Sequence, residues 1–144
     1  MTFIDLADGG RALAPLIEPL LGSGTVVVSA GVGGLVTGAA VAEVLGVEVT
    51  PLTTTRSESG VTVEIPLLVE GLRVVVVDDG VETGTAARAA ARALREAGAA
   101  HLVLAVPVCP REAEADLRTR FDDVVAVERP LVRRSLRWHY ETFA

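Results

Sequence analysis

The segment from Arg73 to Gly98 places the tightest limit on the fold of this chain. It opens with a continuous β-branched run, Arg73-Val74-Val75-Val76-Val77, which predicts a buried strand. A turn with acidic residues and glycine follows over residues 78–84, and we expect a helix from about Gly84 to Ala97 that stops at Gly98. A buried strand, a loop and a helix in this order form a β–loop–α unit.

Strands and helices alternate along the rest of the chain as well. This alternation predicts an α/β fold: a doubly wound, mainly parallel sheet with flanking helices. A polar, glycine-containing turn at residues 56–60 adds a small β-hairpin. The other expected strands are Thr25–Ser29, Val47–Thr54, Val61–Ile65, His101–Val106 and Asp123–Val127, and the other expected helices lie within Asp8–Leu21, from the Ala30–Gly34 loop to about Leu45, and from Pro110 to about Arg120.

Composition limits the class of protein. A chain of 144 residues can form one domain with one core, so we expect a single domain over residues 1–144. The net charge is −6 and all 13 basic residues are arginines without a basic stripe, which argues against nucleic-acid partners. Cys109 is the single cysteine, and we find neither a signal sequence nor a long apolar run, so we expect a cytoplasmic protein that does not bind membranes.

The turn after the central strand carries the residues best suited to bind a ligand. Thr83, Gly84 and Thr85 lie at the start of a helix, where backbone N–H groups lack partners and the helix dipole is positive, so they are suited to a phosphate. Asp78 and Asp79 follow the strand directly and can accept hydrogen bonds from ribose hydroxyls, although an isolated acidic pair can also be a solvated turn. The combination predicts a site for a phosphorylated sugar.

A second glycine-rich turn, Gly31-Val32-Gly33-Gly34, follows the first strand. In a parallel sheet it should lie at the same edge as the acidic turn. Two interpretations stay open: the backbone N–H groups bind an anion, or the glycines only allow the strand and the helix to pack closely.

The segment Val74–Ala86 resembles the signature of type I phosphoribosyltransferases: four apolar residues, two acids, three variable positions and Thr-Gly. The resemblance implies that Asp78 and Asp79 bind the ribose hydroxyls of 5-phosphoribosyl 1-diphosphate (PRPP), directly or through magnesium. It implies that Glu82, Thr83, Gly84, Thr85 and Ala86 surround the 5′-phosphate, and that Gly80 and Val81 also belong to the substrate site. The residues Gly31, Val32, Gly33 and Gly34 would bind the pyrophosphate.

The resemblance also implies a reaction. A nitrogen of a nucleobase-like acceptor attacks the anomeric carbon of PRPP and pyrophosphate leaves, with Asp79 and Glu82 as catalytic residues. Glu82 is equally suited to a second role, in which it only stabilises the helix start. Mg²⁺ would be carried largely by the substrate, with Asp78 and Asp79 as indirect ligands, and the protein would be a homodimer.

The chain departs from the family pattern at three places: Ala86 replaces a hydroxyl residue, Val32 replaces a basic one, and the stretch Thr53–Pro66 is short for a mobile loop. Val32 and the short stretch favour a rival hypothesis, a catalytically weak or inactive PRPP- or nucleotide-binding regulatory module. A dinucleotide-binding domain is disfavoured because the glycine turn lacks the full spacing of that fingerprint. In the tail, two interpretations stay open: Arg133, Arg134, Arg137 and Trp138 cap a base or contact phosphates, or Trp138, Tyr140 and Phe143 anchor the C-terminus on the core.

Overall fold

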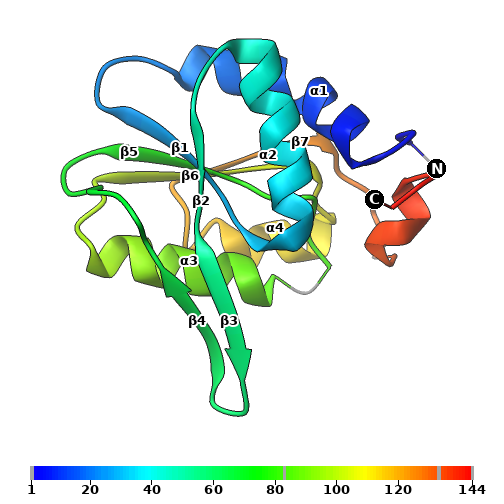
Figure 1. Cartoon of the computed structure of the whole chain (residues 1–144). Helices are drawn as coiled ribbons and strands as arrows, with labels where there is room; N and C mark the ends of the chain where they lie inside the picture. Colours follow the sequence, from blue (N-terminus) through cyan, green and yellow to red (C-terminus); the bar gives the residue numbers. More distant parts are fainter. Residues whose placement is uncertain (1, 83, 133, 144) are drawn as a thin grey trace.

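A five-stranded parallel sheet lies at the centre of the computed structural model, which describes residues 2–82, 84–132 and 134–143 (Figure 1). The strand order is β2-β1-β5-β6-β7, and every neighbouring pair is parallel. The predicted doubly wound, mainly parallel sheet is therefore confirmed. The strands are β1 (Thr25–Ser29), β2 (Val49–Pro51), β5 (Arg73–Val77), β6 (His101–Val108) and β7 (Asp123–Glu128).

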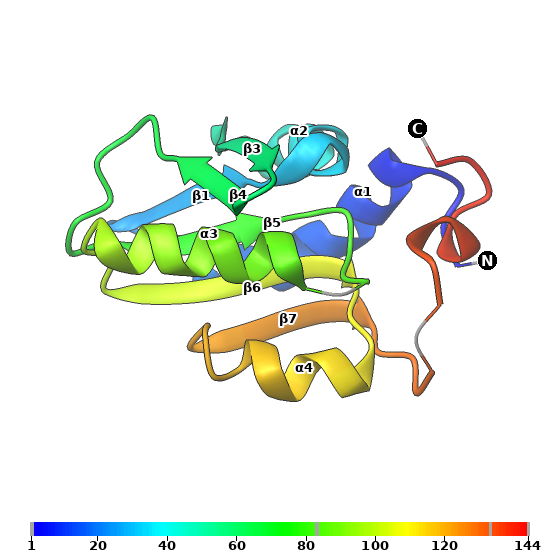
Figure 2. The ribbon, with the colours of Figure 1, turned by 90° about the horizontal axis from the view of Figure 1, so that it is seen from below.

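Helices cover both faces of this sheet because its central strands are apolar on both faces. In β5, Val75 and Val77 pack with helix residues such as Leu13 on one face, whereas Val74 and Val76 belong to the core on the other. Figures 1 and 2 show the two layers of helices. The first layer holds α1 (Leu6–Ile17) and α2 (Gly31–Leu45), and the second holds α3 (Thr85–Glu96) and α4 (Arg111–Leu117).

The strand order reverses between β1 and β5. The chain passes from β1 outward to β2 and then returns to the other side of β1 as β5. Ser29 and Val77 pair at the carboxyl ends of these two strands, and the N–H of Ala30 donates to the carbonyl of Val77 at 2.9 Å. In open α/β sheets, ligands bind in the crevice at such a reversal.

The predicted hairpin is present, but its first strand differs from the expectation. The prediction of a single strand over Val47–Thr54 is wrong, because the chain forms β2 and then a separate strand β3 (Thr53–Ser57). Pro51 ends β2, since proline has no amide hydrogen with which to extend the ladder. Strand β3 pairs antiparallel with β4 (Gly60–Glu64), and only residues 58 and 59 form the turn. The hairpin lies against α3 (Figure 2).

The helix boundaries also differ from the expected ones at their ends. The first helix begins earlier, because the carboxylate of Asp5 accepts a hydrogen bond from the N–H of Asp8 at 2.8 Å and caps α1. Pro15 lies inside this helix, and a short 3-10 helix, η1 (Glu18–Leu20), continues it. None of the helices in the described ranges is long and apolar enough to cross a bilayer.

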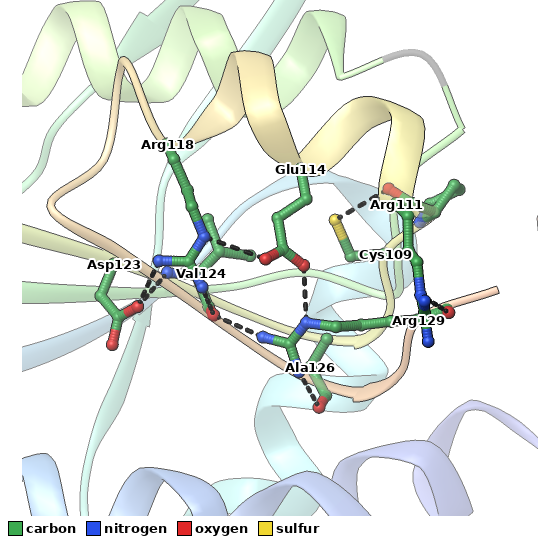
Figure 3. A network of polar contacts seen from close by, with 9 residues as sticks. Cys109, Arg111, Glu114, Arg118, Asp123, Val124, Ala126 and Arg129 are labelled. Atoms are coloured by element: carbon green, nitrogen blue, oxygen red, sulfur yellow. Dashed lines mark hydrogen bonds and ion pairs between the residues drawn. The ribbon is translucent and has the colours of Figure 1, made fainter. Parts of the chain in front are cut away.

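An arginine network joins α4 to β7 (Figure 3). Oε1 of Glu114 accepts from Arg129 Nε at 2.6 Å, and Oε2 accepts from Arg118 Nε at 2.9 Å. Burial acts to raise the pKa of Glu114, but the hydrogen bonds from the two guanidinium groups lower it below the ordinary value. Nearby, Cys109 is buried, and its desolvation raises the pKa of the thiol to about 11, so this cysteine is a core residue.

The two ends of the described chain lie side by side (Figure 1). Phe3 and Tyr140 form a parallel bridge, and their rings are 5.4 Å apart. A second 3-10 helix, η2 (Leu136–His139), leads into this contact. The tail is therefore held against the carboxyl end of the sheet, next to the reversal of strand order.

Candidate functional site

A cavity of about 270 Å³ opens at the carboxyl ends of β1 and β5. Its walls come from four segments that are far apart in the sequence: the start of α2, the hairpin, the turn between β5 and α3, and the tail. The lining residues are Gly31, Val32, Gly33, Arg56, Asp78, Asp79, Gly80, Val81, Glu82, Gly84, Thr85, Ala86, Ala87 and Leu136.

Both residues of the acidic pair line this cavity, Asp78 as a buried residue and Asp79 as a half-buried one. The N–H of Asp79 donates to Oδ1 of Asp78 at 2.7 Å, and the side chain of Asp78 is nearly enclosed. Burial, and then the neighbouring charge of Asp79, raise the pKa of Asp78 well above its ordinary value. The pKa of Asp79 is also raised, again chiefly by burial. Desolvation of two neighbouring carboxylates without a cation is energetically unfavourable, so a bound hydroxyl group or a metal ion would stabilise their ionised form.

Replacing Asp78 with asparagine is expected to stabilise the free protein at pH 7 by about 1 kcal/mol, because it removes an unfavourable buried charge. The folded-state pKa is raised, so the folded form holds the proton more tightly, and wild-type stability falls as pH rises from the unfolded to the folded pKa. The gain should therefore vanish near the ordinary aspartate pKa of about 3.9. Urea unfolding at pH 7 and at a pH near about 3.9 measures the difference in stability between the variant and the wild type. A variant less stable than the wild type at pH 7 would contradict the expectation.

The sequence pattern predicted a separate loop for the glycine-rich segment. In the structure, this segment forms the first turn of α2. Gly31 has φ +75° and carries the chain directly from β1 into the helix. A Cβ on Gly33 would overlap the carboxylate of Asp79, 2.5 Å from its Cγ, and a Cβ on Gly34 would lie 3.3 Å from Asp78 Oδ1. The close-packing interpretation is therefore supported. The first N–H groups of α2 still lack partners inside the helix, so they can also donate to an anion.

The start of α3 forms the opposite wall. Gly84 is the N-cap residue with φ +82°, and Thr85 and Ala86 follow in the first turn. Thr83, predicted to bind phosphate, lies outside the described residues. A Cβ on Gly84 would lie 3.0 Å from Nη1 of Arg88, so this guanidinium lies beside the N-terminus of the helix. The positive helix end and the arginine together favour an anion at this wall.

The C-terminal tail fastens the acidic turn at two points. Oε1 of Glu82 accepts from the N–H of Leu136 at 2.7 Å, and the hydroxyl of buried Tyr140 donates to the carbonyl of Asp79 at 2.6 Å. Glu82 therefore has a structural role that was not among the sequence-based interpretations. No local pattern could have indicated it, because its partner lies 54 residues away along the chain.

Three residues that line the cavity were not predicted from the sequence: Arg56, Ala87 and Leu136. Arg56 was expected in a turn but lies in β3, and it is the one basic residue among the described residues that line the cavity. Leu136 reaches the cavity from the tail. Trp138 is 46% exposed, with the guanidinium of Arg134 at 4.5 Å from its ring centre. Arg133 lies outside the described residues. Tyr140 is buried, so the anchoring interpretation is supported for this residue.

The model of the phosphoribosyl transferase domain matches residues 6–133, which include every lining residue but Leu136. The chain belongs to the phosphoribosyl transferase domain family. The predicted family is therefore confirmed.

Relatives in this family agree with the assignment. Two Mycobacterium tuberculosis proteins, from strains CDC 1551 / Oshkosh and H37Rv, carry phosphoribosyl transferase as a provisional name and are 38% identical over 79 residues. The matched segment is 55% of this chain but only 17% of each relative, so the chain spans a small part of their length.

Solved structures share the fold over most of the chain. The protein TT1426 from Thermus thermophilus is 25% identical with a TM-score of 0.85, covering 100% of this chain and 92% of that one. A Bacillus anthracis hypoxanthine-guanine phosphoribosyltransferase is 19% identical with a TM-score of 0.63, covering 88% and 77%. A Giardia lamblia APRTase complexed with 9-deazaadenine is 17% identical with a TM-score of 0.65, covering 88% and 80%. The last two show likeness of fold alone.

Among metal ions, Mg²⁺ fits the residues that line this cavity. Within the described ranges, no group of three or more histidine, cysteine, aspartate or glutamate residues could form a metal site by itself. Magnesium is commonly held by one or two carboxylates together with substrate phosphates and water. Asp78 and Asp79 are adjacent oxygen donors that line the cavity, so they fit an ion brought in by a phosphorylated substrate.

Proposed function

We propose that this protein transfers the 5-phosphoribosyl group from PRPP to a nitrogen of a nucleobase-like acceptor, with release of pyrophosphate. One observation carries the proposal: the acidic pair and the N-termini of α2 and α3 meet in one cavity at the reversal of strand order. Such a cavity offers hydrogen-bond acceptors between two anion-binding helix ends. PRPP has ribose hydroxyls between two phosphorylated ends, so the two patterns match.

Each wall of the cavity has a part in binding. The hydroxyls of the ribose donate to the carboxylates of Asp78 and Asp79, and this contact favours the ionised acids that burial disfavours. The 5′-phosphate binds at the start of α3, where Gly84 allows close approach of the backbone and Arg88 adds positive charge. The sugar phosphate is thus held by the acidic pair at its hydroxyls and by the start of α3 at its phosphate.

The pyrophosphate end faces the start of α2 and the hairpin. Val32 is 85% exposed and brings no charge to this end, but Arg56 lines the same cavity from β3 and can supply it. Bound magnesium would neutralise the leaving pyrophosphate.

We propose that Asp79 orients the ribose and that Glu82, exposed beside the cavity and held by Leu136, exchanges a proton with the acceptor nitrogen. Fixed charges of this kind stabilise a transition state that develops positive charge on the sugar.

The Asp79→Asn variant tests the proposal by calorimetry with PRPP and Mg²⁺. We expect the affinity to fall about 10- to 100-fold, because a hydrogen bond to a charged group contributes about 1.5–3 kcal/mol. Glu43→Gln, an exposed charge change on α2 outside the cavity, is the matched control and should bind as the wild type does. Equal affinity in Asp79→Asn and the wild type would refute the site.

A regulatory PRPP- or nucleotide-binding module is the second candidate function. The uncharged, exposed Val32 at the pyrophosphate end favours it, because catalysis needs the leaving group to be stabilised. Assays of pyrophosphate release across a panel of nucleobases separate the two functions. Release with any base supports the enzyme, whereas tight PRPP binding without release from any base supports the module. A cytoplasmic homodimer is part of both proposals.

A further inference from the structure

A second cavity, of about 500 Å³, lies between the hairpin and α3. One wall is formed by residues 59–63 of the hairpin, and the other by one side of α3 from Thr85 to Glu96. The two elements lie side by side in Figures 1 and 2. Thr85 lines this groove and also the cavity that contains the acidic pair, so the two cavities meet at the N-terminus of α3.

The groove is basic although the protein as a whole carries a net charge of −6. Three arginines line it, Arg88, Arg92 and Arg120, against one acid, Glu96. Arg88 Nη1 is 3.3 Å from a carboxylate oxygen of Asp116. In the described part of the chain no carboxylate lies within 4.0 Å of the exposed guanidinium of Arg92 or of Arg120.

The arginines are arranged in order away from the helix N-terminus. Arg88 and Arg92 are four residues apart and therefore lie on one side of α3, about 6 Å apart along its axis. The guanidinium of Arg88 lies next to Gly84, at the start of the helix. An anionic chain that begins at the helix N-terminus can therefore pass Arg88 and continue toward Arg92 and Arg120.

We propose that this groove binds the polyphosphate chain of a nucleoside 5′-diphosphate or 5′-triphosphate. This inference rests on the proposed function, because the first phosphate of the chain occupies the place assigned above to the 5′-phosphate of PRPP. The second and third phosphates extend along the groove to Arg92 and Arg120. Arginine suits this ligand, since its guanidinium forms paired hydrogen bonds with phosphate oxygens. The nucleotide and PRPP exclude each other, so a nucleoside 5′-diphosphate or 5′-triphosphate would inhibit the reaction.

Calorimetry at fixed ionic strength tests the groove with three probes: inorganic phosphate, tripolyphosphate and adenosine 5′-triphosphate. The wild type is expected to bind tripolyphosphate at least about tenfold more tightly than phosphate, from the added charge-assisted contacts. In the double variant Arg92→Gln/Arg120→Gln this preference should disappear, while PRPP binding stays within about twofold because neither arginine lines the PRPP cavity. Arg11→Gln, on α1 and therefore on the opposite face of the sheet, is the control and should behave as the wild type.

The outcomes separate this inference from the proposed function. Normal PRPP binding without a preference for tripolyphosphate, or with a preference that survives in the double variant, would overturn the groove alone. Tripolyphosphate binding that depends on Arg92 and Arg120 in a protein that binds no PRPP would overturn the proposed function alone. Competition between adenosine 5′-triphosphate and PRPP supports a shared first phosphate, and simultaneous binding refutes it. Equal affinity for tripolyphosphate and the nucleotide would assign the groove to free polyphosphate.

Discussion

The Gly33→Ala variant is expected to lose PRPP affinity by about 10- to 100-fold, comparable to the loss of a hydrogen bond to a charged group. The new methyl group would overlap the carboxylate of Asp79 and lie 2.9 Å from its Cβ, so Asp79 has to leave its rotamer or α2 has to shift. Either movement separates the acidic pair from the cavity. Calorimetry with PRPP and Mg²⁺ measures the loss.

The folding stability of this variant should change much less than its affinity. Alanine is favoured over glycine inside a helix by about 1 kcal/mol, which offsets part of the steric cost at Gly33. Gly22→Ala is the control for the added methyl group, because nothing lies within 4 Å of a Cβ at that position. Unchanged PRPP affinity in Gly33→Ala would show that the close contact between α2 and Asp79 is not required for binding.

The Gly80→Ala variant is expected to lose about 2–4 kcal/mol of unfolding free energy, since it adds backbone strain to a steric overlap. Gly80 has φ +145°, a conformation that residues with a side chain rarely adopt, and its Cβ would lie 2.5 Å from Cδ2 of Leu136. The overlap pushes apart the acidic turn and the tail, which Glu82 joins to Leu136. Urea unfolding measures the change.

Two further variants separate strain from overlap at Gly80. Gly46→Ala adds a methyl group at φ +66° with nothing within 4 Å, so it should show the strain alone, about 1–2 kcal/mol. In the double variant Gly80→Ala/Leu136→Ala, the overlap with Leu136 is absent, and the two losses should be less than additive. Full additivity would contradict the contact with Leu136.

Local sequence patterns were sufficient where the structure depends on neighbouring residues. The strand Arg73–Val77 and the helix after it were predicted within one residue, because an unbroken β-branched run and helical spacing are local signals. The boundary between β2 and β3 was not predicted, because Leu52 is part of the core and the chain changes sheets there. Apolar residues on both sides of the boundary conceal it from a pattern-based prediction.

The same distinction applies to the site. By itself the sequence determined the α/β class, the β–loop–α unit, and the acidic pair that precedes a helix N-terminus suited to phosphate. Each of these features is indicated by residues that are close together along the chain. Only the tertiary structure decided that the glycines of α2 pack on that pair, that Arg56 and Leu136 line the cavity, and that Tyr140 holds Asp79 from 61 residues away. Contacts across such separations follow from how the layers pack, and packing is not encoded in any short segment.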